Sequence, residues 1–191
     1  MKKILILVLM LGGFSLQASD LKLDASHSRI GFKVPHLMIS SVYGNFNNFH
    51  GDFKYDEKKG TFSDFQVSID PSSINTADPK RDKHLRGEDF FDVKKYSEIK
   101  FVSDKTIRAK KGGSELKGNL TMHGVTKEIS LKVKFKGVMM DPWGNRHLIL
   151  EISGTINRKD FGLNWNKSLD QGGVMVGDEV ELIVEAQGVD K

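Results

Sequence analysis

The sequence predicts an all-β domain of about eight antiparallel strands, with one short helix in a long connection. Three observations predict this class. Apolar and polar residues alternate along many segments, as they do in strands that have one buried side and one wet side. Short turn sequences rich in glycine, proline, aspartate and asparagine join most of these segments, which favours antiparallel hairpins. The chain also has no cysteine, so a hydrophobic core has to hold the domain together without disulfides.

Residues 1–18 have the layout of a secretory signal peptide. Lys2 and Lys3 precede an unbroken apolar run, Ile4 to Leu11, and small residues lead up to Ala18. The run is too short to span a bilayer. We therefore expect cleavage after Ala18 and one mature domain, residues 19–191, in the periplasm or secreted. Without a cysteine we expect no lipid anchor at the new N-terminus.

The first clear strand follows Ser28. One face of it bears Ile30, Phe32, Val34 and His36, while the other bears Arg29, Gly31, Lys33 and Pro35. The apolar face therefore ends in a histidine. A comparable strand buries Phe65, Val67 and Ile69, and it ends before Pro71 because proline cannot donate a ladder hydrogen bond.

The long connection, residues 71–98, contains the signals of a short helix. Asp78 is a suitable N-cap, Pro79 suits the first turn, and Gly87 is a typical stop, so we expect a helix from Pro79 to Arg86. Phe90 and Phe91 follow. This segment either covers an opening or plugs the core, and the sequence leaves both interpretations open.

The second half of the chain predicts strand after strand. Their buried faces hold Ile99, Phe101 and Ser103; Leu116, Gly118, Leu120 and Met122; Ile129, Leu131, Val133 and Phe135; Leu148, Leu150, Ile152, Gly154 and Ile156; and Val180, Leu182, Val184 and Ala186. Closure into a barrel would remove the exposed edges of such a sheet. Eight strands make a barrel of about the size that holds one small ligand. A two-sheet sandwich would give a similar pattern.

Catalytic and metal-binding motifs are missing from the sequence. The six histidines form no H-E-x-x-H or H-x-H pair, no serine lies in a G-x-S-x-G turn, and no phosphate-binding loop occurs. Loss of Lys2 and Lys3 lowers the formal charge from +4 to +2, which is too small to favour nucleic acid. We expect no enzyme activity, no metal and no cofactor. The basic cluster Lys105, Arg108, Lys110 and Lys111 is either a solvated hairpin end or a weak contact for anionic lipid.

Inward apolar and aromatic side chains are either ordinary core or the wall of a cavity for an apolar guest. The candidate wall residues are Ile30, Phe32, Val34, Phe46, Phe65, Val67, Phe91, Phe101, Leu131, Val133, Phe135, Phe161 and Trp165. His36 and Arg158 interrupt the inward rows and are candidates for a ligand's polar end. A buried arginine needs partners, so Arg158 paired with Asp160 or Asp170 is the structural alternative.

These residues resemble the YceI-like family of bacterial periplasmic proteins over essentially all of the mature chain. The matching pieces, in order, are Asp24-x-x-His27-Ser28-x-Ile30-x-Phe32-x-Val34-x-His36, Gly44-x-Phe46, Ile69-Asp70, Ser73-Ile74-x-Thr76, Arg81-Asp82-x-His84-Leu85, Phe90-Phe91-Asp92-Val93, Phe101-x-Ser103, Gly118-x-Leu120-Thr121-x-His123-Gly124-Val125-Thr126-Lys127 and Arg158-x-Asp160-Phe161-Gly162. One departure is Ser97, where the family usually has proline; it affects only the local turn.

The resemblance implies a lipocalin-like antiparallel eight-stranded barrel with an elongated hydrophobic cavity. It also implies a carrier that binds a long amphiphile, such as a polyisoprenoid, an isoprenoid quinone or a fatty-acid derivative. Two other functions stay open: an enzyme acting on a lipid-like substrate, with His36 and a nearby carboxylate as acid and base, and a solidly packed barrel that acts as an interaction module. Transient contact with a membrane surface and a homodimer are both compatible with the sequence.

Overall fold

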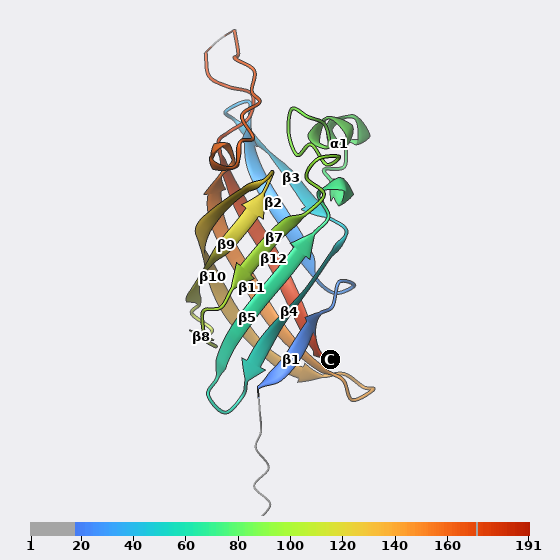
Figure 1. Ribbon diagram of the computed structural model, residues 1–191, viewed down its shortest axis with the longest axis vertical. Helices are drawn as coiled ribbons and strands as arrows, with labels where there is room; N and C mark the ends of the chain where they lie inside the picture. Colours follow the sequence, from blue (N-terminus) through green and yellow to red (C-terminus); the bar gives the residue numbers. More distant parts are fainter. Residues whose placement is uncertain (1–17, 171) are drawn as a thin grey trace, which may run out of the picture.

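The computed structural model describes residues 18–170 and 172–191 as an elongated antiparallel barrel (Figure 1). Apart from Ala18, the predicted signal peptide lies outside the described residues. None of the helices in the described part of the chain has the length and apolar character needed to cross a bilayer.

Eight strands form the closed wall of the barrel. Their order around it is β1-β4-β5-β7-β9-β10-β11-β12, and pairing of β1 with β12 closes the ring. The bounds are β1 Ser19–Leu23, β4 Phe49–Asp56, β5 Thr61–Ile69, β7 Ile99–Ser103, β9 Ser114–Met122, β10 Val125–Met140, β11 Arg146–Asn157 and β12 Glu179–Asp190. All pairings in the ring are antiparallel, which confirms the predicted barrel and excludes the sandwich.

Four further strands extend this wall: β2 Arg29–His36, β3 Ser40–Phe46, β6 Ile74–Asn75 and β8 Ile107–Arg108. The long strand β12 pairs with β1 near its end, where Leu23 faces Gly188, and with β2 nearer its start, where Phe32 faces Leu182. The upper wall then continues from β2 to β3 and β6. The prediction of about eight strands missed β1 and did not divide residues 28–53 into three strands.

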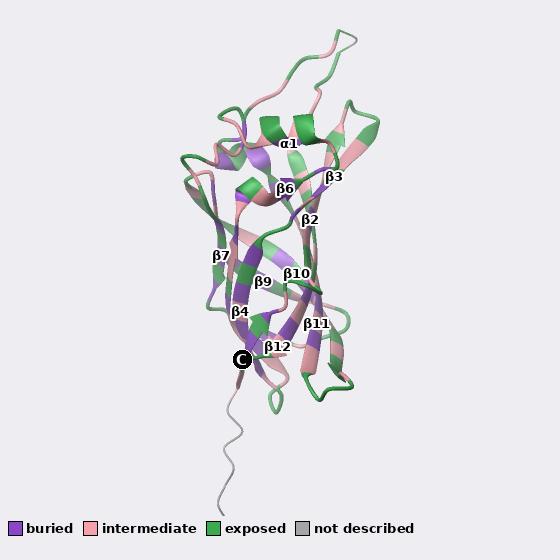
Figure 2. Cartoon of the chain, turned by 90° about the vertical axis from the view of Figure 1, so that its right-hand side faces the viewer, coloured by how far each residue is buried: buried purple, intermediate pink, exposed green. Residues whose placement is uncertain are grey.

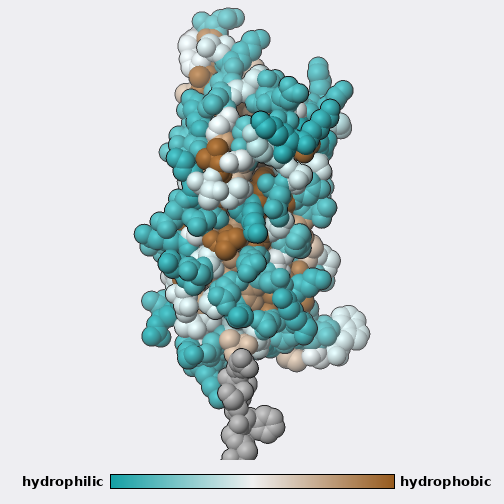
Figure 3. All heavy atoms as spheres, viewed as in Figure 1, coloured by the Kyte–Doolittle hydropathy of each residue, from teal (hydrophilic) through white to brown (hydrophobic). Residues whose placement is uncertain are grey.

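The wall alternates between buried and exposed positions (Figure 2). Strand β9 buries Leu116, Gly118, Leu120 and Met122, which is the row that the sequence predicts. The face of the barrel seen in Figure 3 is mostly hydrophilic, with hydrophobic residues in small separate areas. The alternation therefore places the core inside the barrel.

Aromatic rings fill the end of the barrel where β4 turns into β5. Tyr55 stacks on Phe62 with 4.7 Å between ring centroids, and Phe53 stacks on Phe65 at 5.6 Å. Phe135 contacts this group, with its ring 5.5 Å from that of Phe62. We call these five residues the basal aromatic cluster. It closes one end of the barrel with side chains.

Glycines in the wall make room for inward rings. A Cβ on Gly188 would lie 2.5 Å from Phe53 Cζ, and one on Gly118 would lie 2.5 Å from Phe101 Cζ. No side chain fits at such distances unless the ring moves. Large rings can therefore point into the barrel because the facing strands approach with no side chain.

The predicted short helix is present as α1, Pro79–Leu85, with Asp78 as its N-cap and Arg86 as its C-cap. The Asp78 carboxylate accepts hydrogen bonds from the backbone N–H groups of Lys80 and Arg81 at 3.0 and 3.1 Å. Asp82 is buried and accepts hydrogen bonds from the backbone and hydroxyl of Thr76. These bonds hold α1 against the chain that follows β6. The short 3-10 helices are η1, Pro71–Ser73, and η2, Arg158–Phe161.

We predict that Leu148→Ala lowers the free energy of unfolding by about 2–5 kcal/mol, because Leu148 is fully buried and its loss leaves a cavity. Denaturant unfolding followed by circular dichroism measures the change. Ile183→Ala, at an outward position of the neighbouring strand with 37% exposure, is the control and should change stability by less than about 1 kcal/mol. An equal loss in both variants would contradict this assignment of the core.

We also predict an acid-dependent contribution from Asp24, in the turn between β1 and β2. Burial alone would raise the pKa of this carboxyl, but hydrogen bonds from Ser26 and His27 outweigh it and lower the pKa to about 2. A lowered pKa stabilises the fold above the ordinary value of 3.8, and this stabilisation disappears as the pH falls through about 2. Wild type should therefore lose more unfolding free energy than Asp24→Asn over this window, as measured by denaturant titration. If the unfolding free energies of wild type and Asp24→Asn fall in parallel with pH, the predicted contribution of Asp24 is refuted.

Candidate functional site

An apolar chamber occupies the middle of the barrel. Its volume is about 150 Å³, and the surface exposed in it is entirely apolar. Strands from all sides contribute to it, including Ile30 and Phe32 from β2, Phe65 from β5, Phe101 from β7 and Leu131 from β10. The basal aromatic cluster lies at one end, where Phe53 and Phe65 belong to both. This chamber is the innermost part of the candidate site.

A second apolar chamber of about 110 Å³ continues the first toward α1. The two chambers share the lining residues Phe32, Phe46, Met122, Ile156 and Leu182. The second chamber adds Leu85 of α1, and Phe90 and Phe91 from the segment after it. The long connection therefore covers an opening in the upper wall, which is the first of the two interpretations that the sequence left open.

The third chamber, of about 450 Å³, is the mouth of the cavity. It shares Phe32, Val34, Leu85, Phe90 and Val176 with the second chamber. It lies at the upper end in Figure 1, where α1 and the connection 162–178 flank the barrel. Here the lining first becomes polar, with His36, Asp78, Lys80, Arg81 and His84. The surface exposed in the mouth is still largely apolar, so the site changes from wholly apolar inside to a mixture of apolar and polar side chains at its entrance.

Three rings close part of the mouth. The His84 ring meets the rings of Phe90 and Trp165 edge-on, with centroid distances of 5.1 and 5.0 Å, and the Phe90 and Trp165 centroids are 5.2 Å apart. His84 Nε2 is also 2.9 Å from Asp89 Oδ2. The contacts connect α1 to the connection 162–178. We call His84, Phe90 and Trp165 the gate.

Arg158 lies in the wall of the second chamber, but its guanidinium is occupied by the protein. It is 3% exposed, and it donates to the backbone carbonyls of Gly177, Leu163 and Trp165 at 2.8, 2.5 and 2.9 Å. Its acidic partner is Asp178, at 3.4 Å, and not Asp160 or Asp170 as the sequence suggested. Burial lowers the pKa of Arg158, and Asp178 opposes this shift. The geometry is that of an anchor for the connection 162–178.

Most of the predicted wall residues line these chambers: Ile30, Phe32, Val34, Phe46, Phe65, Val67, Phe91, Phe101, Leu131 and Trp165. The structure does not place Val133, Phe135 and Phe161 there. Phe135 belongs to the basal aromatic cluster, Val133 is buried apart from the chambers, and Phe161 is buried where its carbonyl faces His123. Alternation predicts which side chains point inward, but not their height along the barrel. His36 lines the mouth.

Several lining residues were missed by the sequence analysis as parts of the site. Leu120, Met122, Ile156, Val180, Leu182 and Val184 have the same inward alternation as the predicted wall, so that pattern could have found them. Lys80, Arg81 and His84 carried no such signal, because only the packing of α1 brings them to the mouth. Across residues 18–170 and 172–191, no three histidine, aspartate or glutamate side chains gather as metal ligands would.

Comparisons with known proteins agree with this geometry. The family model for the YceI-like domain matches residues 21–188. Protein YceI of Salmonella newport is 39% identical over 176 residues, which cover 90% of this chain and 87% of that protein. The crystal structure of the Campylobacter jejuni YCEI protein is 31% identical, with a TM-score of 0.69, over 88% of this chain and 96% of that chain.

A more distant structure has the same fold. It is a polyisoprenoid binding domain from Saccharophagus degradans, with 17% identity and a TM-score of 0.63 over 92% of this chain and all of that domain. On the strength of the family match over nearly all of the described residues, this chain belongs to the YceI-like family.

Proposed function

We propose that this protein binds one long amphiphile, a polyisoprenoid, an isoprenoid quinone or a fatty-acid derivative, and carries it through the periplasm. The observation that supports this most directly is the row of three adjoining chambers, which expose only apolar surface in the inner two and some polar surface at the mouth. The name of the Saccharophagus degradans neighbour, a polyisoprenoid binding domain, supports the ligand class. The predicted signal peptide supports the location.

The size of the chambers favours a thin chain. The inner two, about 150 and 110 Å³, are each smaller than the pockets that enclose drug-sized ligands. A flexible hydrocarbon chain can pass through both in sequence, whereas a broad fused ring system would have to displace several wall residues. Each buried methylene contributes roughly 0.8 kcal/mol, so about ten buried carbons contribute roughly 8 kcal/mol before the entropy of association is subtracted. Burial of the tail is therefore enough for useful affinity.

The mouth favours an anionic head group, such as a phosphate or a carboxylate. Lys80, Arg81, His36 and His84 line it, and the carboxylate of Asp78 is engaged as the cap of α1. Arg81 also donates to the hydroxyl and carbonyl of Thr76, and His84 pairs with Asp89, so Lys80 and His36 are the groups that we expect to meet the head group. Arg158, the other sequence candidate for the polar end, is held by backbone carbonyls. We therefore place the polar end of the ligand at the mouth, beside His36, and its tail toward the basal aromatic cluster.

We propose binding and not catalysis for His36. Within the described residues its ring forms no hydrogen bond with a carboxylate, so no acid–base pair is assembled around it. A solidly packed barrel, the remaining alternative, describes only the basal end, where the aromatic rings fill the interior.

Mass spectrometry of the purified protein tests this function. The protein should be isolated from the periplasmic fraction of its own host, extracted with organic solvent and compared with the extract of a mock purification. We expect one enriched lipid in roughly stoichiometric amount. The proposal fails if no lipid is enriched and delipidated protein binds neither an added isoprenoid quinone nor an added fatty acid.

We predict that Val34→Trp blocks ligand binding. Val34 lines both the second chamber and the mouth, so an indole at this position would obstruct the passage between them. Affinity for a fluorescent fatty acid should fall about tenfold or more, because the tail can no longer be buried. The control is Lys33→Trp, whose side chain is on the opposite face of β2 and pairs with Glu181. Equal affinity in both variants would contradict the assigned passage.

A further inference from the structure

The turn between β2 and β3 consists of Leu37, Met38 and Ile39, which are 38%, 67% and 93% exposed. Val174, from the connection 162–178, is 37% exposed and belongs to the same region. The Leu37 N–H donates to the Met175 carbonyl at 2.9 Å, which joins the turn to that connection. We call Leu37, Met38, Ile39 and Val174 the apical patch.

The barrel does not need large apolar side chains at this turn. Leu37 and Met38 have φ values of 53° and 65°, in the left-handed region where glycine or asparagine is favoured. The whole segment 34–43 contains no aspartate, glutamate, lysine or arginine, although 28% of the chain is charged. The exposed parts of these apolar side chains contribute nothing to the core of the barrel. Such a patch is characteristic of a contact made with something outside the chain.

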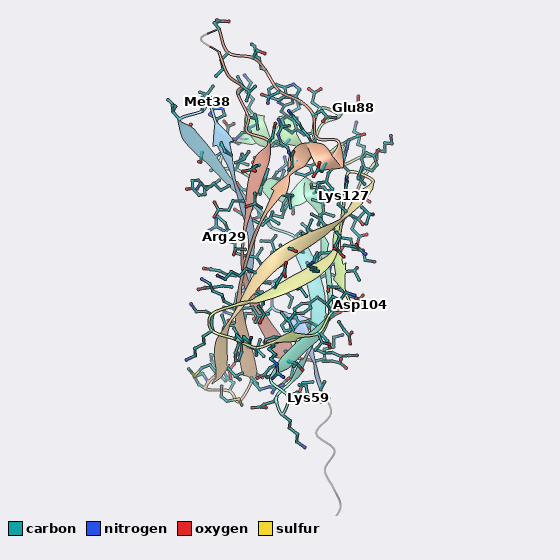
Figure 4. The ribbon with its side chains drawn as sticks, turned by 90° about the vertical axis from the view of Figure 1, so that its left-hand side faces the viewer. Arg29, Met38, Lys59, Glu88, Asp104 and Lys127 are labelled. Atoms are coloured by element: carbon teal, nitrogen blue, oxygen red, sulfur yellow. The ribbon has the colours of Figure 1, made fainter. Side chains whose placement is uncertain are left out.

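The patch adjoins the mouth of the cavity. Pro35 and His36, directly before the turn, line the mouth, as does Val42 on the returning strand. Figure 4 shows Met38 at the apical end of the molecule, far from Lys59 at the basal end. An apolar ligand that leaves the cavity would therefore emerge beside the apolar turn.

The charges around the mouth are complementary to an anionic surface. The exposed side chains of α1 include Lys80, Lys83 and His84, while its cap Asp78 is hydrogen-bonded to the helix and Asp82 is buried. Asp89 is exposed and pairs with His84 at 2.9 Å, so Lys80 and Lys83 are the cations that α1 offers to a surface. Glu88 is exposed as well, but it lies on the opposite side of the apical end from Met38 (Figure 4). Apolar side chains that insert between lipids, next to basic side chains that meet head groups, are the usual combination in proteins that bind anionic membranes.

We infer that the apical end docks on an anionic lipid bilayer, with Leu37, Met38 and Ile39 inserted among the lipids and the basic side of α1 against the head groups. This docking rests on the proposed function for its purpose, since it lets a lipid pass between bilayer and cavity without crossing water. The physical interaction itself does not require a ligand, so the two can be tested apart.

Vesicle flotation tests the docking. The mature protein is mixed with vesicles of equal parts phosphatidylglycerol and phosphatidylcholine, or of phosphatidylcholine alone. Wild type should float with the anionic vesicles, and less so in high salt. Replacement of Leu37, Met38 and Ile39 by serine should weaken this binding about tenfold or more.

The control removes a similar exposed apolar group at the basal end: Met139, Met140 and Trp143, in and beside the turn between β10 and β11, replaced by serine. This variant should bind vesicles as wild type does. The chain has no cysteine, so Ile39→Cys and Met139→Cys can each carry one environment-sensitive fluorophore. A blue shift on vesicles is expected at position 39 only.

Fatty-acid binding in solution is measured for the same serine variants. The serine variant of the turn should retain it, because none of the three side chains lines the cavity. The inference is overturned if wild type ignores the anionic vesicles, if the serine variant of the turn binds them equally, or if sedimentation shows a dimer that this variant alone disrupts. If wild type binds no fatty acid in solution, the proposed function is refuted, whereas the vesicle result still decides the docking.

Discussion

Closure of the sheet by β12 is the constraint on which the rest of the structure depends. This strand pairs with β11 on one side, and with β1 and then β2 on the other. Each of the eight ring strands thus pairs on both sides. Because β1 pairs with β12, no long unpaired edge is left there to bind a strand of another chain. Because the ring is closed, every inward side chain competes for one enclosed volume. At each height along the barrel axis, the size of the inward side chains decides whether the interior is packed core or open cavity.

The interior of the barrel is closed in different ways at its two ends. At the basal end, five aromatic rings fill the interior, and Gly188 gives room to one of them, Phe53. At the apical end, β2 and β3 continue the wall away from β1, where short β6 pairs with β3 and the connection 162–178 pairs with the end of β2 through His36 and Val176. The opening that results is covered by α1 and the rings after it. A cavity with one closed end and one covered end follows from this asymmetry.

The cover is held by buried polar interactions as well as by apolar packing of Leu85 and Phe91 against the core. Arg158 gathers carbonyls from both sides of the connection 162–178, and Asp82 ties α1 to Thr76. Both groups are buried and hydrogen-bonded, so replacement by a group with fewer donors or acceptors would leave unsatisfied partners. The gate between them consists of ring contacts without a backbone ladder. In the described chain, α1 and the connection 162–178 are therefore each held by buried hydrogen bonds and meet through contacts between side-chain rings.

The sequence alone determined the strands of the barrel, their inward faces, the helix α1 and the family. The alternation in segments such as 129–135 and 180–186 predicted strands and their inward faces, because side chains in a strand point to opposite sides regardless of context. Asp78, Pro79 and Gly87 predicted α1 nearly to the residue, because capping is a local interaction. The resemblance of many ordered motifs predicted the family.

Only the tertiary structure decided how far each inward residue lies from the mouth. Leu131 and Phe135 lie on the same inward row of β10, yet Leu131 borders the inner chamber and Phe135 lies in the basal aromatic cluster. The partner of Arg158, the division of 28–53 into three strands and the basic mouth formed by α1 were likewise set by long-range packing. Parity and capping depend on neighbours a few residues away, whereas depth, ion pairing and the meeting of distant loops depend on closure of the whole barrel.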